Sequence, residues 1–308
     1  MANPNLRALA RYSDSLSQVY LEHAVIERED HSIAAFTPEG RITLPAANLS
    51  CVILGPGTRI THAAIKVLAD CGSVVVWTGA EGLNFYACGQ SKTRLSRGIE
   101  LQAHHWADPN RRLQVVRRMY ELRFPDPLAE GLTLQQIRGK EGVRVRDTYQ
   151  KLAREYGVSW NGRRYERENW EESDPINKAL SSANAGLYAI VLAGLHSLGY
   201  SPSLGFIHTG KQLSFVYDVA DLVKTKTSLP AAFEAASDGP ERVESRARRI
   251  LRDRCSHERL QDQLTKLIPR LFQGLPEDID SQAADLVTEI WDPHGNLRGG
   301  IQHAGDDS

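Results

Sequence analysis

The chain has 308 residues, of which 41% are hydrophobic and 24% are charged, and its formal net charge is −1. This length is enough for two hydrophobic cores, and the composition is ordinary for a globular protein. No apolar run reaches the length of a membrane span, and the N-terminus lacks a charged-then-apolar leader, so we expect a cytoplasmic protein with no membrane role. The four cysteines form no CxxC pair and are predicted to be reduced.

Residues 1–90 read as a β-rich domain. Short apolar runs predict strands, and the turn Pro38-Glu39-Gly40 separates two of them. Residues 61–70 predict one helix, with Thr61 as N-cap and Gly72 as its left-handed stop. The strand candidates are 19–21 with 24–26, 32–36, 41–44, 51–54, and a hairpin of 73–77 with 83–87.

From Gly98 onward the apolar period becomes helical, with loops expected at 124–132 and 157–175. We therefore predict an α+β protein: an N-terminal β-rich, sandwich-like domain over 1–90, a linker at 91–97 and a mostly α-helical catalytic domain over 98–276. The tail 277–308 is acidic and poor in apolar residues, which predicts partial disorder.

Charge is strongly segregated along the chain. Residues 91–170 hold 17 Lys and Arg against 10 Asp and Glu, whereas residues 277–308 hold one Arg against eight acids. A basic middle with interleaved aromatic residues favours binding to nucleic acid through phosphates and stacked bases. Pairing of these arginines with nearby acids on solvated helices remains an alternative of about equal weight on charge alone.

The stretch 205–224 concentrates the chemistry-bearing residues. His208 lies in a Gly-bounded turn, and if Ser214 onward is helical, Asp218, Asp221 and Lys224 share one helix face. Two carboxylates on one face repel, so a positive charge between them is expected, and a divalent cation such as Mg²⁺ or Mn²⁺ suits oxygen and imidazole ligands. A solvated Asp-x-x-Asp face is the commoner alternative in an arbitrary protein.

The run from Gly205 to Lys224 resembles the signature of the CRISPR-associated integrase family of spacer acquisition. Upstream, Arg138-Gly139-Lys140-Glu141-Gly142 resembles a second motif of that family. Residues 156–165 and 174–177, with 54–64 near the start, are similar to its type I-E branch in particular. The similarity runs in register from about residue 16 to about 270.

The resemblance implies an integrase and endonuclease of antiviral defence. It implies a homodimer, a small ferredoxin-like partner protein, and insertion of captured double-stranded DNA into CRISPR repeat DNA. It places metal ligands on Glu141, His208 and Asp221, with Asp218 as a supporting acid. We expect Mg²⁺ or Mn²⁺ there to activate a phosphodiester for attack by a DNA 3′-hydroxyl.

Candidate DNA contacts are basic or aromatic residues in the matching segments and in the arginine-rich helix after residue 242. They are Arg59, Lys66, Arg138, Arg146, Arg163, Tyr165, Tyr188, Lys211, Tyr217, Lys224 and Arg248. His23 stands near the position where the type I-E branch has an aromatic cap for the DNA end, and Asn84 occupies a strand position where that branch can carry an arginine. A catalytically silent DNA scaffold and a general branched-DNA nuclease remain as alternative functions.

Overall fold

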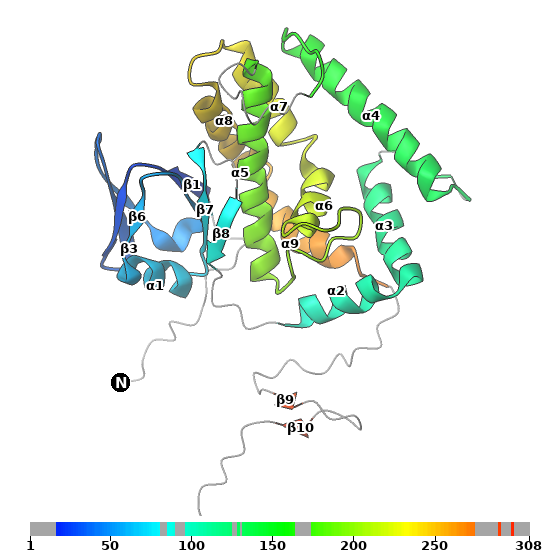
Figure 1. Cartoon of the computed structure of the whole chain (residues 1–308), viewed down its shortest axis with the longest axis horizontal. Coiled ribbons are helices and arrows are strands. Elements are labelled where there is room, and N and C mark those ends of the chain that lie inside the picture. Colours follow the sequence, from blue (N-terminus) through cyan, green and yellow to red (C-terminus); the bar gives the residue numbers. More distant parts are fainter. Residues whose placement is uncertain are drawn as a thin grey trace, which may run out of the picture. The chain divides into compact units, whose positions relative to one another are not determined.

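The computed structural model describes residues 17–80, 85–89, 96–124, 128–129, 131–163, 174–274, 289–290 and 297–298. Its contacts divide the chain into two units, Met1–Gln273 and Gly274–Ser308. In the first unit, β-rich structure precedes helices (Figure 1). The predicted α+β class is confirmed. The predicted domain bounds stay predictions.

The β-rich part contains two four-stranded sheets. The first has the order β1-β5-β7-β8, in which β1, β5 and β7 are parallel and β8 is antiparallel. The second has the order β4-β3-β2-β6, with antiparallel β2-β3-β4 and a parallel β6. The strands are β1 (Ser17–Leu21), β2 (Val25–Glu29), β3 (Ser32–Thr37), β4 (Gly40–Leu44), β5 (Leu49–Leu54), β6 (Arg59–Ile60), β7 (Val74–Thr78) and β8 (Phe85–Gly89).

A single core joins both sheets to the helix α1 (His62–Asp70). Buried side chains from β1, β2, β3, β5 and β7 meet Ala64 and Leu68 of α1. Thr61 accepts the backbone N–H of Ala64 and Gly72 has φ of +80°, so the predicted cap and stop are both confirmed. The apolar runs 19–21 and 24–26, which we expected together, instead belong to different sheets.

Three of the remaining helices, α3, α4 and α5, begin at capping side chains. Asp108 accepts two backbone N–H groups at the start of α3, Thr133 and Gln136 form a capping box at α4, and Asp174 caps α5. The helices are α2 (Arg97–Ala107), α3 (Pro109–Arg123), α4 (Leu134–Glu155), α5 (Pro175–Ser197), α6 (Ser214–Val223), α7 (Ser228–Ser237), α8 (Val243–His257) and α9 (Leu260–Arg270).

Helix α5 is the central element of the helical part. It packs against α6, α7, α8 and α9 and also contacts β1, β5 and β7. By length and composition this helix is apolar enough to cross a membrane, contrary to our expectation that no apolar run has this length. However, 83% of its most apolar window is buried within the protein, as expected for a core helix.

In the second unit, β9 (Glu289–Ile290) and β10 (Leu297–Arg298) pair antiparallel, a pairing that the sequence did not predict. The expected disorder of the tail falls mostly outside the described residues.

Candidate active site

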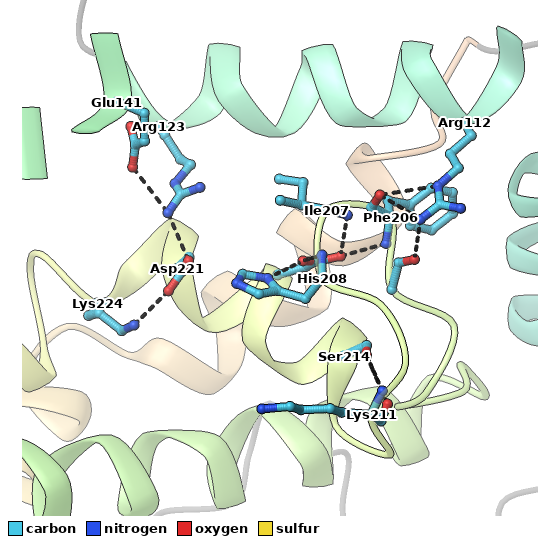
Figure 2. Close-up of polar contacts among 12 residues, drawn as sticks. Arg112, Arg123, Glu141, Phe206, Ile207, His208, Lys211, Ser214, Asp221 and Lys224 are labelled. Carbon is cyan, nitrogen blue, oxygen red and sulfur yellow. Dashed lines mark hydrogen bonds and ion pairs between the residues drawn. The ribbon is translucent and has the colours of Figure 1, made fainter. Parts of the chain in front are cut away.

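A short loop and the helix α6 form the centre of the site. The carboxylate of Asp218 on α6 has no exposed surface and accepts the backbone N–H groups of Phe206 at 2.6 Å, Ile207 at 3.0 Å and His208 at 2.9 Å (Figure 2). Three N–H donors compensate a buried charge well, because hydrogen bonds to an ionised group are strong. Asp218 therefore fixes the conformation of the loop that carries His208.

The imidazole of His208 is held by the same carboxylate. Its Nδ1 lies 2.7 Å from Asp218 Oδ1, and its side chain is 44% exposed. This hydrogen bond raises the pKa of His208 above its ordinary value, although burial opposes the effect. When Nδ1 donates to the carboxylate, Nε2 of the neutral ring is left as the acceptor, which is the state a metal ligand requires.

A second cluster brings Glu141 of α4 and Asp221 of α6 to opposite sides of one guanidinium. Arg123 Nη2 at the end of α3 lies 3.1 Å from Glu141 Oε1 and 2.9 Å from Asp221 Oδ2 (Figure 2). Arg144 contacts the other oxygen of Glu141 at 3.2 Å, and Lys224 contacts the other oxygen of Asp221 at 2.6 Å. Two predicted metal ligands thus face each other across a cation supplied by the chain.

The charges in this cluster keep Asp221 ionised. Burial opposes its ionisation, but Lys224 and Arg123 outweigh that effect and hold the pKa of Asp221 below its ordinary value. Burial likewise disfavours the Lys224 ammonium, yet Tyr188 and Asp221 raise the pKa of Lys224 above its ordinary value. Asp221 is therefore in the form that binds a cation.

The chain itself supplies partners for both aspartates: His208 and three backbone N–H groups at Asp218, and Lys224 and Arg123 at Asp221. The divalent ion that we expected between them stays a prediction. We expected the positive charge around Glu141 to come from basic residues adjacent to it in sequence. Of those neighbours, Arg144 contacts it, while Arg138 and Arg146 are exposed.

The donor set nevertheless suits a divalent ion. Glu141 and Asp221 offer carboxylate oxygens on either side of a position that already holds positive charge, and His208 offers a nitrogen from the neighbouring loop. Within the described ranges, no three His, Cys, Asp or Glu side chains converge closely enough to hold an ion as they stand. The assignment of Glu141, His208 and Asp221 as ligands stays a prediction.

Two residues that sequence reasoning missed brace the loop from its other side. Arg112 of α3 donates from Nε and Nη2 to the carbonyl oxygen of Phe206 at 3.1 and 2.9 Å, and Trp106 Nε1 donates to Gly205 O at 3.1 Å. Gly205 fits there because an added Cβ would overlap the carbonyl oxygen of His208. No local signal identifies Arg112, since it lies within one of several arginine pairs on the chain.

The predicted DNA contacts fall into three groups. The exposed ones are Arg59, Lys66, Arg138, Arg146, Lys211 and Arg163, although Lys66 pairs with Asp70 and Arg163 donates to Asn177 and Ser181. Those close to the site are Tyr188, Tyr217 and Lys224: the two tyrosine rings meet edge to face at 5.0 Å, and Lys224 Nζ lies 5.8 Å from the Tyr188 ring. Arg248 is half-buried over the ring of Tyr20 at 4.4 Å and donates to Ser182.

Two other aromatic residues of the basic middle of the chain, Tyr149 and Trp160, pack against each other. Tyr149 stacks on Trp160 with ring centroids 4.7 Å apart, and both contact Phe233 in the helical core. Both rings are partly buried and pack against the helical core. Tyr165 and Asn84 lie outside the described residues. His23 is exposed with φ of 49°, and its capping role stays a prediction.

The comparisons with known proteins agree on one family. Residues 123–233 match the family described as CRISPR associated protein Cas1. The chain is 48% identical to CRISPR-associated endonuclease Cas1 2 of Thermus thermophilus over 98% of this chain and 94% of that relative. It is 39% identical to CRISPR-associated endonuclease Cas1 of Escherichia coli K12, over 91% of this chain and 94% of that relative.

Structural similarity extends over the same length. The crystal structure of a TtCas1–DNA complex superposes with a TM-score of 0.81 at 46% identity, covering 92% of this chain and 100% of that chain. Identity at this level over nearly the whole chain establishes common descent as well as common fold. The chain belongs to the Cas1 family of CRISPR-associated endonucleases.

Proposed function

We propose that this protein is a Mg²⁺- or Mn²⁺-dependent integrase of the type I-E branch. It inserts captured double-stranded DNA fragments into CRISPR repeat DNA by attack of a 3′-hydroxyl on a repeat phosphodiester. One observation carries the proposal most directly: Glu141 and Asp221, far apart in sequence, lie on opposite sides of a single cation beside the loop of His208.

Glu141, His208 and Asp221 would hold the ion. When bound, a divalent ion polarises a phosphate and favours the ionised form of an attacking hydroxyl. Asp218 keeps the His208 ring in the orientation that leaves Nε2 free for ligation, and it does so from a position with no solvent access. The loop is clamped on both sides, so the imidazole is in place before any ligand arrives.

The DNA phosphates would meet cationic side chains around this site. Lys224 lies beside Tyr188 and next to Asp221, and Lys211 is exposed at the start of the same segment. A phosphate oxygen can accept from the ammonium of either lysine and from the hydroxyl of Tyr217. No covalent bond between protein and DNA is needed, because the nucleophile is the DNA end itself.

Partners and location complete the proposal. Similarity to a chain solved as a DNA complex supports DNA binding here. We propose that a homodimer of this chain acts with a small ferredoxin-like protein in the cytoplasm, and that no membrane is involved.

Strand transfer tests the proposal. A labelled duplex with free 3′-hydroxyls is incubated with a plasmid carrying the repeat array, the partner protein and Mg²⁺ or Mn²⁺. Asp221→Ala and Glu141→Ala are expected to abolish the product while leaving DNA affinity nearly unchanged, since each removes a ligand of one ion. The control Asp253→Ala alters a carboxylate that is 62% exposed on α8 and should retain wild-type transfer.

The result distinguishes the alternatives. Wild-type product that requires metal and a free 3′ end supports the integrase, and equal loss of binding and transfer in Asp221→Ala counts against the ligand assignment. A silent DNA scaffold has one observation in its favour, because Arg123 already neutralises Glu141 and Asp221 without metal. Tight DNA binding with no product under either metal would select that alternative, and cleavage of branched DNA without integration would select the nuclease.

A further inference from the structure

Arg123 occupies the space between two predicted metal ligands. A single nitrogen, Nη2, contacts both Glu141 and Asp221, and the three side chains are 9%, 11% and 17% exposed (Figure 2). Among the described residues, Arg123 is the one cation that the ion pairs place against both carboxylates, since Arg144 and Lys224 each contact one. A side-chain cation thus lies between the two carboxylates that the proposed function assigns to one divalent ion.

All four carboxylate oxygens are engaged. Glu141 Oε1 forms an ion pair with Arg123, and Asp221 Oδ2 accepts a hydrogen bond from the same nitrogen. The other two oxygens, Glu141 Oε2 and Asp221 Oδ1, accept from Arg144 and Lys224. An ion that takes both oxygens contacted by Arg123 has to replace Nη2. A divalent ion beside a guanidinium at that spacing would be strongly repelled, because screening is weak at a buried site.

Arg123 can make room for an ion only by a change in its side-chain conformation. A guanidinium keeps its positive charge in proteins, so Arg123 does not become neutral to make room for a metal. Its contacts are also incomplete: Nε is buried without a hydrogen-bond partner in the described part of the chain. Arg123 is the last residue of α3, and the backbone becomes extended at Phe124, whose N–H makes the final helical hydrogen bond to the carbonyl oxygen of Tyr120.

We propose that Arg123 is an internal stand-in cation that keeps the metal-free site neutralised and has to be displaced before a divalent ion binds Glu141 and Asp221 together. This inference rests on the proposed function, because it takes those two carboxylates as ligands. The apparent affinity for the ion is then the intrinsic affinity reduced by the fraction of molecules in which the arginine has turned away.

Metal titration without DNA tests the inference. Binding of Mn²⁺ to the full-length wild type, Arg123→Met and Arg144→Met is measured by calorimetry. Arg123→Met is expected to bind Mn²⁺ about tenfold more tightly than wild type or better, because the binding-competent fraction approaches one. Arg144→Met is the matched control: it also removes one cation from Glu141 but does not empty the position between the carboxylates.

Thermal unfolding gives an independent readout. In EDTA, Arg123→Met should melt below wild type because two buried carboxylates then face each other, and Mn²⁺ should raise its melting temperature more than that of wild type. Affinity of Arg123→Met equal to or weaker than wild type would overturn the proposal. An equal gain in Arg144→Met would also overturn it, since net charge alone would then explain the effect.

Two further measurements keep the proposal testable if Arg123→Met does not fold. Arg123→Lys keeps the charge as a compact ammonium without the planar fork, and should show an intermediate gain in Mn²⁺ affinity. A crystal structure of the wild type with Mn²⁺ should show the guanidinium turned out, and one that still bridges Glu141 and Asp221 with the ion bound would refute displacement.

Failure of this inference differs from failure of the proposed function. Wild type that binds Mn²⁺ and performs strand transfer, with no affinity gain in Arg123→Met or Arg123→Lys, would refute the stand-in cation alone. Wild type that neither binds Mn²⁺ nor transfers strands would refute both proposals.

Discussion

The substitution Asp218→Asn tests how far the active-site loop depends on one buried carboxylate. Asparagine keeps the shape of the side chain but replaces one acceptor oxygen with an NH₂ group. In the wild type, Oδ2 accepts from the N–H groups of Phe206 and Ile207, and Oδ1 accepts from the N–H and Nδ1 of His208. With the NH₂ group in place of Oδ2, the N–H groups of Phe206 and Ile207 both lose their acceptor at a side chain with no exposed surface. With the NH₂ group in place of Oδ1, the N–H of His208 loses its acceptor, and Nδ1 keeps a partner only in the other tautomer.

The expected cost follows from these donors. A buried donor left without an acceptor costs about 1–3 kcal/mol, so one or two such donors cost about 1–6 kcal/mol of unfolding free energy. Loss of the negative charge acts in the same direction, because hydrogen bonds to an ionised group are stronger than neutral ones. The total free energy of unfolding of a domain is only about 5–15 kcal/mol, so the variant should be severely destabilised.

Urea unfolding followed by tryptophan fluorescence and circular dichroism measures this cost. The control is Asp253→Asn, whose carboxylate is 62% exposed, and it should stay within about 0.5 kcal/mol of wild type. A loss below about 1 kcal/mol in Asp218→Asn, at an unchanged denaturant slope, would show that the loop holds its conformation without this carboxylate.

Three further predictions use the same geometry. Gly205→Ala places a Cβ against the His208 carbonyl oxygen, so it should lower stability by about 1–3 kcal/mol and reduce strand transfer; a wild-type melting curve would contradict this. Arg248→Met should weaken DNA binding and reduce the slope of log affinity against log salt concentration by about one unit. An unchanged slope would show that Arg248 does not contact a DNA phosphate and only packs over the ring of Tyr20. Cys255 is buried, and its burial raises the pKa of its thiol to about 12, so very little of it is ionised at pH 8. Mass spectrometry after iodoacetamide treatment should find Cys255 unmodified in the folded protein and alkylated in urea, and rapid labelling of the folded chain would contradict its burial.

Local features of the fold were predictable because local chemistry decides them. The cap at Thr61, the stop at Gly72 and the helix from Ser214 were all read from short segments, in which capping groups and apolar spacing act over a few residues. The parallel pairing of β5 with β1 and with β7 was not predictable, because it depends on contacts across long connections. For the same reason, two adjacent apolar runs were assigned together although they lie in different sheets.

At the site, the order of amino acids specifies which residues are present and places Asp218 and Asp221 on one short helix that Lys224 caps. The partners of these side chains depend on how the helices pack. Arg123 and Asp221 are 98 residues apart, and nothing local marks that arginine among the many basic residues of the middle of the chain. Side-chain charges act over a few ångströms in space, whatever their separation along the chain, so the packing of α3, α4 and α6 determines which cation lies between Glu141 and Asp221.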